Sequence, residues 1–296
     1  MLKKLKGIGL LILSNILIFV TLSITFTILA DFILPAFGIH IRGSIDQGVL
    51  FFAVLFGFGG AFASLLFSKT IAKMMIQGYR IERPRNHAEM VVYETVHKIA
   101  QRLNIEPPEI WIYDSPDPNA FATGPSKNNS MVAVSTGLIQ NLNEHEVRAV
   151  LAHEMGHVYN GDMFTTTVLA GLLNTFVYLL AHWISRQIAE RNEALGFMAY
   201  FFLVNVLAIL AYIPINWFSR HREFAADRFA ANTVGKQYMI SALQAIDRWV
   251  KSTQFQYQTD DALATMKISG RTSSFMKLFA THPPIEARVA ALQQLP

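Results

Sequence analysis

Long apolar runs divide this chain into lipid-seeking and water-seeking parts. Hydrophobic residues dominate positions 7–34, 49–67, 163–184 and 196–218, and polar stretches lie between and after these runs. About 20 apolar helical residues cross a hydrocarbon layer of about 30 Å, so each run is long enough to span a membrane. We therefore predict four hydrophobic helical segments arranged in two hairpins. The alternative is that these helices are buried in a large soluble fold. This alternative is stronger for the last two runs, of which the fourth contains Asn205 and Pro214. Whether these two runs cross the membrane completely is left open by the sequence.

The second run carries small residues at helical spacing. Gly57, Gly60, Ala61 and Ser64 recur at intervals that place them near one face of a helix. Small side chains on one face let another helix approach closely within a membrane. We expect this stripe to face a neighbouring helix.

The stretch between the second and third runs has soluble character. Apolar positions from His87 to Leu103 recur with a helical period, and the segments EIWIYD, NAFATG and MVAVSTG predict three strands. Asn143 and Glu146 form a capping box, which predicts a helix that runs through His157 and ends at NGD. The tail, 236–296, is predicted to be mostly helical, with a turn at THPP. The fold is therefore predicted as mainly α and integral to a membrane, with a soluble α+β part that contains a small β-sheet.

These patterns divide the chain into four expected ranges. Residues 1–78 form an N-terminal membrane hairpin, and residues 163–218 form a second hydrophobic hairpin. Residues 79–162 and 219–296 are the two soluble parts.

Composition supports the membrane prediction and limits the chemistry. Hydrophobic residues make up 52% of the chain and charged residues 16%, a balance that suits a partly lipid-embedded protein. Cysteine is absent, so any metal must take histidine and carboxylate ligands. The net charge of +4 fits basic loops against anionic lipid, and the sequence has no arginine-aromatic array typical of nucleic-acid binding.

Basic residues orient the chain. The connection between the first two runs holds Arg42 as its single Lys or Arg, whereas such residues cluster before the first run and after the second: Lys3, Lys4, Lys6, Lys69, Lys73, Arg80, Arg83 and Arg85. Positively charged loops remain in the cytoplasm, so the amino terminus and the residues after position 68 are predicted to be cytoplasmic. The first run is longer than the apolar region of a signal peptide, and we interpret it as an uncleaved anchor.

The sequence HEMGH is the strongest chemical signal. His153 and His157 are four residues apart, so both imidazoles leave the same face of a helix and can bind one ion at about 2.0–2.1 Å. Glu154 lies beside them and can take a proton from a water that the metal activates. An amphipathic helix with two histidines on its polar side is the structural alternative.

A third ligand is expected in SRHREFAADRFAA. Glu223 and Asp227 are four residues apart on one helical face, which suits a Glu that completes a zinc site and an Asp that accepts the second N–H of a ligand histidine. The alternative is a solvated helix with surface salt bridges. Asp162, just past the HEMGH helix, is a weaker rival for the third position because it points off the face of the two histidines.

Together these motifs resemble the HtpX-type membrane zinc proteases, which are related to the CAAX prenyl endopeptidases. HEMGH, NGD, the second hydrophobic hairpin and SRHREFAAD, preceded by two N-terminal runs and NAFATG, extend the resemblance over nearly the whole chain. The CAAX enzymes carry additional spans that this chain lacks, which argues against prenylated substrates. The resemblance implies a cytosolic zincin-type protease domain of the gluzincin arrangement, with one Zn²⁺ per chain. It implies His153, His157 and Glu223 as ligands, Glu154 as general base and Asp227 behind the ligands.

The resemblance also implies substrate contacts. NAFATG would be an edge strand whose residues Asn119, Ala120 and Phe121 pair with an extended substrate, and Arg288 would bind substrate near the cleft. His282 would act in catalysis as a second oxyanion donor. The alternatives are a strand end with a glycine turn for NAFATG and a simple turn residue for His282. Arg222 and Arg288 are substitutes for that donor, or partners of nearby carboxylates.

The resulting hypothesis is a multi-pass zinc metalloendopeptidase of the bacterial inner membrane, with its amino terminus and active site cytoplasmic. The resemblance implies cleavage of misfolded or damaged membrane proteins, in quality control and the stress response. Expected partners are polypeptide substrates, membrane proteins among them, and the lipid bilayer, with no nucleic acid. Alternatives are a zinc-binding membrane scaffold without proteolytic activity and a processing protease with a single substrate.

Overall fold

The computed structural model describes residues 20, 23–24, 27–36, 38, 45–260 and 282–295. The chain divides into two compact units, each of which takes two parts of the sequence. The hydrophobic unit comprises Met1–Ser64 and Thr166–Ile215, and the mixed unit comprises Leu65–Thr165 and Asn216–Pro296. The four predicted domain ranges stay predictions, because compactness alone does not define independently folding domains.

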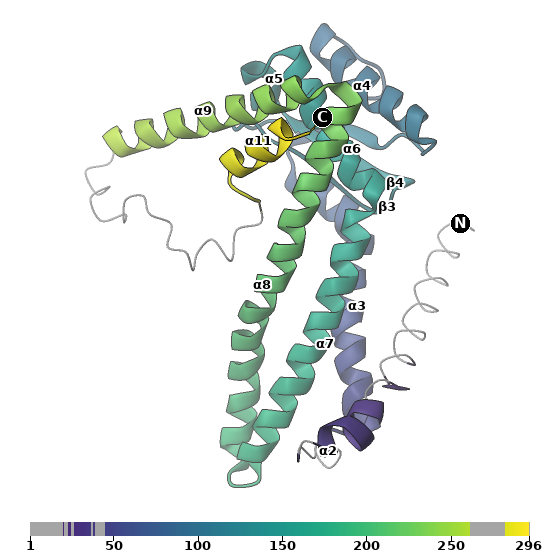
Figure 1. Cartoon of the computed structure of the whole chain (residues 1–296), viewed down its shortest axis with the longest axis vertical. Coiled ribbons are helices and arrows are strands. Elements are labelled where there is room, and N and C mark those ends of the chain that lie inside the picture. The colour runs from purple at the N-terminus through teal and green to yellow at the C-terminus, as the bar shows by residue number, and fades with distance from the viewer. Residues whose placement is uncertain are drawn as a thin grey trace. The chain divides into compact units, whose positions relative to one another are not determined.

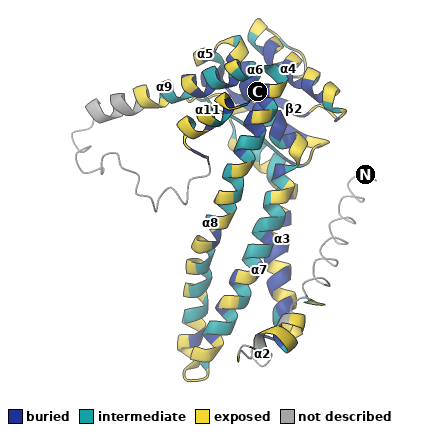
Figure 2. Ribbon diagram, viewed as in Figure 1, coloured by how far each residue is buried: buried dark blue, intermediate teal, exposed yellow. Residues whose placement is uncertain are grey.

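Three helices within the described residues are long and apolar enough to cross a membrane: α3 (Gln47–Met75), α7 (Asp162–Ala189) and α8 (Glu193–Val234). They contain the second, third and fourth predicted runs. Large apolar side chains on α8 face outward, with Phe197 67% and Phe202 68% exposed, and such exposure along a helix suits contact with lipid (Figure 2). Most of the first run lies outside the described residues, apart from short pieces that include a π-helix, Leu29–Ile33, and α2, Leu34–Ala36. The count of four segments and the two hairpins therefore stay predictions.

Within the described residues, part of the small-residue stripe of α3 is a contact face. A side chain at Gly57 would collide with Thr175, and Thr175 Oγ1 donates a hydrogen bond to the carbonyl of Ala53 over 3.4 Å. Among the described residues, a side chain at Gly60 would meet nothing within 4 Å. Gly57 and its neighbours Ala53 and Phe58 form the packed face, and a helix contact at Gly60 stays a prediction, because most of the first run lies outside the described residues.

The mixed unit contains a four-stranded sheet in the order β1-β2-β4-β3. Its strands are β1 (Gly78–Arg80), β2 (Glu109–Tyr113), β3 (Ala120–Ser126) and β4 (Asn129–Ser135). β2 and β4 are parallel, whereas β3 pairs antiparallel with β4 and forms an edge of the sheet. The three predicted strands are present, and β1 was not predicted because its three exposed residues show no alternation.

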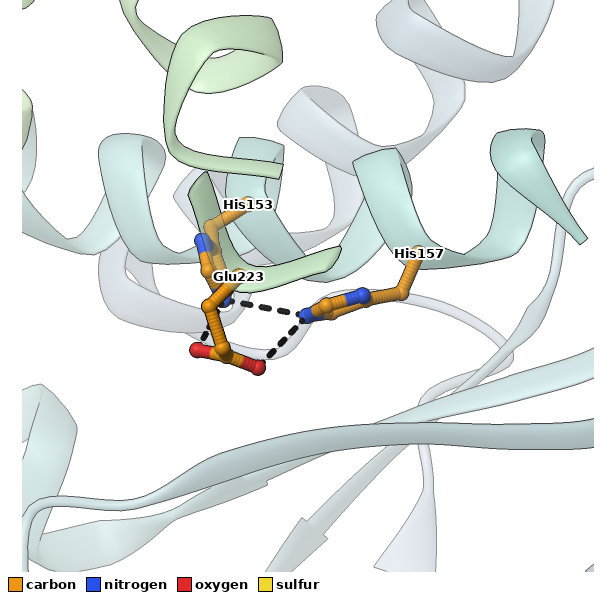
Figure 3. A group of neighbouring side chains, drawn as sticks. All are labelled: His153, His157 and Glu223. Atoms are coloured by element: carbon orange, nitrogen blue, oxygen red, sulfur yellow. Dashed lines mark hydrogen bonds and ion pairs between the residues drawn. The ribbon is translucent and has the colours of Figure 1, made fainter. Parts of the chain in front are cut away.

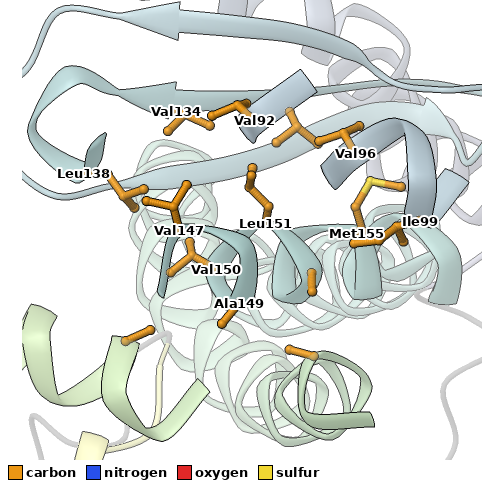
Figure 4. Packing of buried hydrophobic residues seen from close by; sticks show 14 of the residues in the cluster. Val92, Val96, Ile99, Val134, Leu138, Val147, Ala149, Val150, Leu151 and Met155 are labelled. Carbon is orange, nitrogen blue, oxygen red and sulfur yellow. The ribbon is translucent and has the colours of Figure 1, made fainter. Parts of the chain in front are cut away.

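Five helices of the mixed unit are α4 (His87–Leu103), α5 (Thr136–Asn141), α6 (Glu144–Asn160), α9 (Lys236–Asp260) and α11 (Ile285–Gln293). In the core, α4 and α6 face each other beside the strand that carries Val134, through Val92, Val96, Leu151 and Met155, all fully buried (Figure 4). The predicted capping box forms: Asn143 accepts from the backbone of Glu146, whose side chain accepts from Asn143 N. This burial and capping hold α6 rigidly, which matters because α6 carries HEMGH.

α8 is one continuous helix of 42 residues that contains the whole fourth run and SRHREFAAD (Figure 1). Pro214 lies inside it. Because the helix does not end at position 218, Glu223 and Asp227 lie on the same helix as the apolar run, four residues apart on one face.

Candidate active site

α6 places two imidazoles together, as its sequence spacing predicts. His153 is buried and His157 half-buried, and their Nε2 atoms lie 3.2 Å apart (Figure 3). Asn143 fixes the start of the helix, and Gly161, at φ +68°, ends it with a left-handed residue immediately before Asp162. The pair is thus set by local helix geometry.

The third predicted ligand, the carboxylate of Glu223, comes from α8, 66 residues beyond His157 in sequence. Glu223 Oε1 lies 3.3 Å from His157 Nε2, and Oε2 lies 3.5 Å from His153 Nε2 (Figure 3). Gly156 lets the helices come close, since a side chain there would lie 3.2 Å from Ala226 Cα and from the ring of Phe229. His153, His157 and Glu223 form, within the described residues, a group compact enough to hold a metal ion.

These three residues fit a zinc ion. Ligand atoms that each lie about 2.0–2.1 Å from a tetrahedral zinc are expected about 3.3–3.4 Å apart, and the separations observed here are 3.2, 3.3 and 3.5 Å. Both Nδ1 atoms are occupied by carboxylates, Asp227 for His153 at 2.9 Å and Asp162 for His157 at 2.7 Å, which leaves Nε2 lone pairs for a metal. Oε2 of Glu223 is buried and accepts no well-aligned hydrogen bond.

The electrostatics of the site favour a positive charge. Burial by itself would lower the pKa of His157, but the carboxylates of Asp162 and Glu223 raise it to about 10. The pKa of His153 is also raised, since Asp227 and Glu223 outweigh its burial. A proton and a divalent cation compete for this position, and the fixed carboxylates stabilise either one.

The side chain of Glu154, on α6, points towards the edge strand β3. Burial raises the pKa of its carboxyl, while the nearby histidines and a hydrogen bond from the backbone of Ala122 lower it in part. A carboxyl with a raised pKa beside a metal group is suited to accept and return a proton. Its contact with Ala122 places it at the open side of β3.

β3 presents alternate backbone groups to its open edge. The N–H of Asn119 donates to Ser135 Oγ and its carbonyl accepts from Ser135 N, both over 2.9 Å. Phe121 is opposite Ala133, two residues farther along the same ladder, so its backbone also faces β4. Ala120 and Ala122 are therefore the residues whose backbone groups face outward. Of the three residues predicted to pair with substrate, only Ala120 has outward backbone groups. Because the strand has a period of two, Ala122 is the second residue with this orientation.

The C-terminal part supplies His282 and Arg288 to the site. His282 is exposed, and its Nδ1 lies 2.9 Å from Glu223 Oε2. Arg288 is buried and binds Asp227 twice, Nε to Oδ2 at 2.7 Å and one terminal nitrogen to Oδ1 at 2.6 Å, with another terminal nitrogen 3.3 Å from Glu223 Oε2. Arg288 thus lies near the metal group, where two buried carboxylates occupy its guanidinium, and substrate binding by Arg288 stays a prediction. Arg288 is consequently a partner of the metal group's carboxylates, as one alternative proposed.

Asp162 and Arg222 occupy positions that agree with alternatives left open by the sequence. Asp162, the rival ligand, accepts a hydrogen bond from His157 Nδ1 and lies behind that histidine. Arg222, a substitute oxyanion donor, binds Asp162 Oδ1 through Nε over 2.6 Å. Sequence spacing could not reveal this pair, since its two members are 60 residues apart.

Comparisons with known proteins identify the family of this chain. The model for peptidase family M48 matches residues 86–295. Protease HtpX of Idiomarina loihiensis is 43% identical over 98% of this chain and 99% of its own length, and Protease HtpX of Pasteurella multocida is 41% identical over 96% and 99%. Among solved structures, S. mikatae Ste24p matches with a TM-score of 0.62 at 19% identity, over 95% of this chain and 67% of its own, which shows a shared fold. The chain therefore belongs to peptidase family M48 and is a membrane-associated metalloprotease of the HtpX type.

Proposed function

We propose that the protein is a zinc-dependent endopeptidase that cleaves misfolded or damaged membrane proteins at the cytoplasmic face of the bacterial inner membrane. The observation that supports it most directly is the juxtaposition of three elements within the mixed unit: a metal-binding group, a half-buried glutamate beside it and an open strand edge. The quality-control and stress roles rest on the similarity to HtpX proteases.

Each residue has a distinct task in this mechanism. His153, His157 and Glu223 would hold one zinc ion per chain, which when bound acidifies a water and polarises the scissile carbonyl. Glu154 accepts the proton from the attacking water and delivers it to the leaving amine. Asp227 holds the His153 imidazole through Nδ1.

The substrate is held as an added strand. The outward N–H and C=O groups of Ala120 and the outward carbonyl of Ala122 pair with the substrate's backbone, and such pairing is largely indifferent to side chains. Broad specificity of this kind suits degradation of many unfolded polypeptides better than processing of one substrate. His282 is exposed beside Glu223 and free to donate to the developing oxyanion, whereas Arg288 stays with Asp227 and Glu223.

The cytoplasmic location rests on charge. Lysines and arginines lie before the first apolar run and after the second, and the intervening connection carries little positive charge. Both parts of the mixed unit are continuous with the cytoplasmic ends of the predicted spans.

Replacing Glu154 with Gln tests the proposal. The full-length variant in detergent should retain one zinc per chain, because Glu154 is not a ligand, and should lose cleavage of an unfolded test protein by at least about 10²-fold. Replacement of Glu94 with Gln, on the surface of α4, is the matched control. Cleavage by the Glu154 variant at the wild-type rate would show that the site is a structural zinc scaffold, and a survey of cut sites separates broad from single-substrate proteolysis.

A further inference from the structure

Both metal-site histidines are backed by an aspartate that is itself held by an arginine. His153 Nδ1 contacts Asp227, which binds Arg288 through two hydrogen bonds. His157 Nδ1 contacts Asp162, and Asp162 binds Arg222. These two His–Asp–Arg arrangements are called the His153 chain and the His157 chain below. The His153 chain contains the expected Asp227, whereas neither Asp162 nor Arg222 of the His157 chain has a role in the function proposed above.

The two oxygens of Asp162 are divided between its partners. Oδ2 accepts from His157 over 2.7 Å, while Oδ1 accepts from both Nε and a terminal nitrogen of Arg222. Asp162 is 6% exposed, so removal of Arg222 leaves a nearly buried carboxylate with one partner fewer. Charge-assisted contacts of this kind fix orientation as well as energy.

The position of the pair in the chain gives it further significance. Asp162 is the first residue of α7, and Arg222 lies on α8 beside the predicted ligand Glu223. Residues 166–215 between them belong to the hydrophobic unit. The pair therefore joins the two points at which the chain leaves the mixed unit for that segment and returns from it.

We propose that Asp162 and Arg222 are a positioning pair for the His157 imidazole, and that joining the two ends of the hydrophobic segment sets the protein's affinity for zinc. The proposal rests on the zinc site of the proposed function. Asp162 fixes the tautomer and the ring direction of His157, and Arg222 fixes Asp162. Arg222 touches no predicted ligand atom, so its effect on the metal acts through two intervening groups.

The test measures zinc affinity of the full-length protein in detergent by competition with a chelator. Replacing Asp162 with Ala should weaken zinc binding about 10- to 100-fold, the range known for partners of metal-ligating histidines. Replacing Arg222 with Gln should weaken it by less, within about tenfold, and replacing Arg222 with Lys should restore most of the loss. Replacing Asp247 with Asn, in an exposed pair with Lys251, removes one negative charge as the control and should change nothing.

A structural role alone would give a different pattern. The thermal midpoint of the metal-free Arg222→Gln variant should stay near that of the metal-free wild type, while the upward shift on adding zinc shrinks. Equal zinc affinity in the wild type, Asp162→Ala and Arg222→Gln would overturn the proposal. Complete loss of zinc in Asp162→Ala, matching Glu223→Gln, would also overturn it by making Asp162 a ligand. A wild type that binds no zinc would instead refute the proposed function.

Discussion

The two His–Asp–Arg chains of the metal site share their chemistry but differ in burial. In the His153 chain the side chains of Asp227 and Arg288 are 3% and 10% exposed, and in the His157 chain those of Asp162 and Arg222 are 8% and 28% exposed. The residues of the first come from α6, α8 and α11, and those of the second come from α6, the start of α7 and α8. We infer that the His153–Asp227–Arg288 arrangement mainly stabilises the fold. The His157–Asp162–Arg222 arrangement, by contrast, is sensitive to changes in structure at the two ends of the hydrophobic segment.

The largest expected effect separates the two arginines. Replacing Arg288 with Ala leaves the buried Asp227 without its bidentate partner and should cost about 3–5 kcal/mol of unfolding free energy. Replacing Arg222 with Ala, at a more exposed pair, should cost about 1 kcal/mol or less. Denaturant unfolding of both metal-free proteins measures the difference, and equal losses would mean that burial does not distinguish the two chains.

The next effect concerns Glu223, the third predicted ligand, which is not part of either His–Asp–Arg arrangement. His282 contacts Glu223 and is exposed, so replacing it with Gln should lower kcat by about 10²-fold, as for loss of one oxyanion donor. Zinc content and KM for an unfolded substrate should stay near wild-type values. A parallel loss of zinc would instead assign His282 to the metal site itself.

A smaller effect should disturb the His157 chain alone. Gly161 has a φ of +68° and ends α6 immediately before Asp162, so an alanine there is strained by about 1 kcal/mol. The Gly161→Ala protein should show weaker zinc binding with little change in the His153 chain. Replacing Gly161 with Asn, which tolerates this conformation better, is the control, and equal effects of both substitutions would exclude backbone strain as the cause.

The smallest effect comes from the ion pairs of Glu109 with Lys69 and Lys73, which lie outside both His–Asp–Arg arrangements. Burial would raise the pKa of Glu109, but Lys73 and Lys69 hold it at about 2. A lowered pKa stabilises the fold above the ordinary value of 4.5, and this contribution is lost as pH falls from 4.5 towards 2. Replacing Glu109 with Gln should therefore lower stability modestly at pH 7 and hardly at all near pH 2. A stability difference that persists near pH 2 would contradict this account.

Local patterns predicted the elements that the structure then contained. The capping box of Asn143 and Glu146 set the start of α6, and the four-residue spacing of His153 and His157 placed both on one face. Apolar runs predicted the bodies of α3, α7 and α8. Each of these features depends on residues close in sequence, which is why pattern reading sufficed.

The partners of the site residues escaped prediction for the opposite reason. Arg288 was predicted near the cleft, but the sequence did not indicate that its main partner is Asp227, 61 residues away. Ala122 faces the open edge because of how β3 pairs with β4, a register that the strand's own sequence does not specify. Such contacts depend on which distant segments pack together.

The sequence by itself determined the apolar runs, the metal helix and the kinds of ligand available, because helix period, capping and the absence of cysteine are local or compositional properties. Only the tertiary structure decided that Glu223 meets the two histidines, because Gly156 lets α8 lie close against α6. It alone decided that Arg222 holds Asp162 behind His157, because Arg222 is 60 residues from Asp162 in sequence. Hydrogen bonds and ion pairs between distant residues form only after packing has brought their helices within reach.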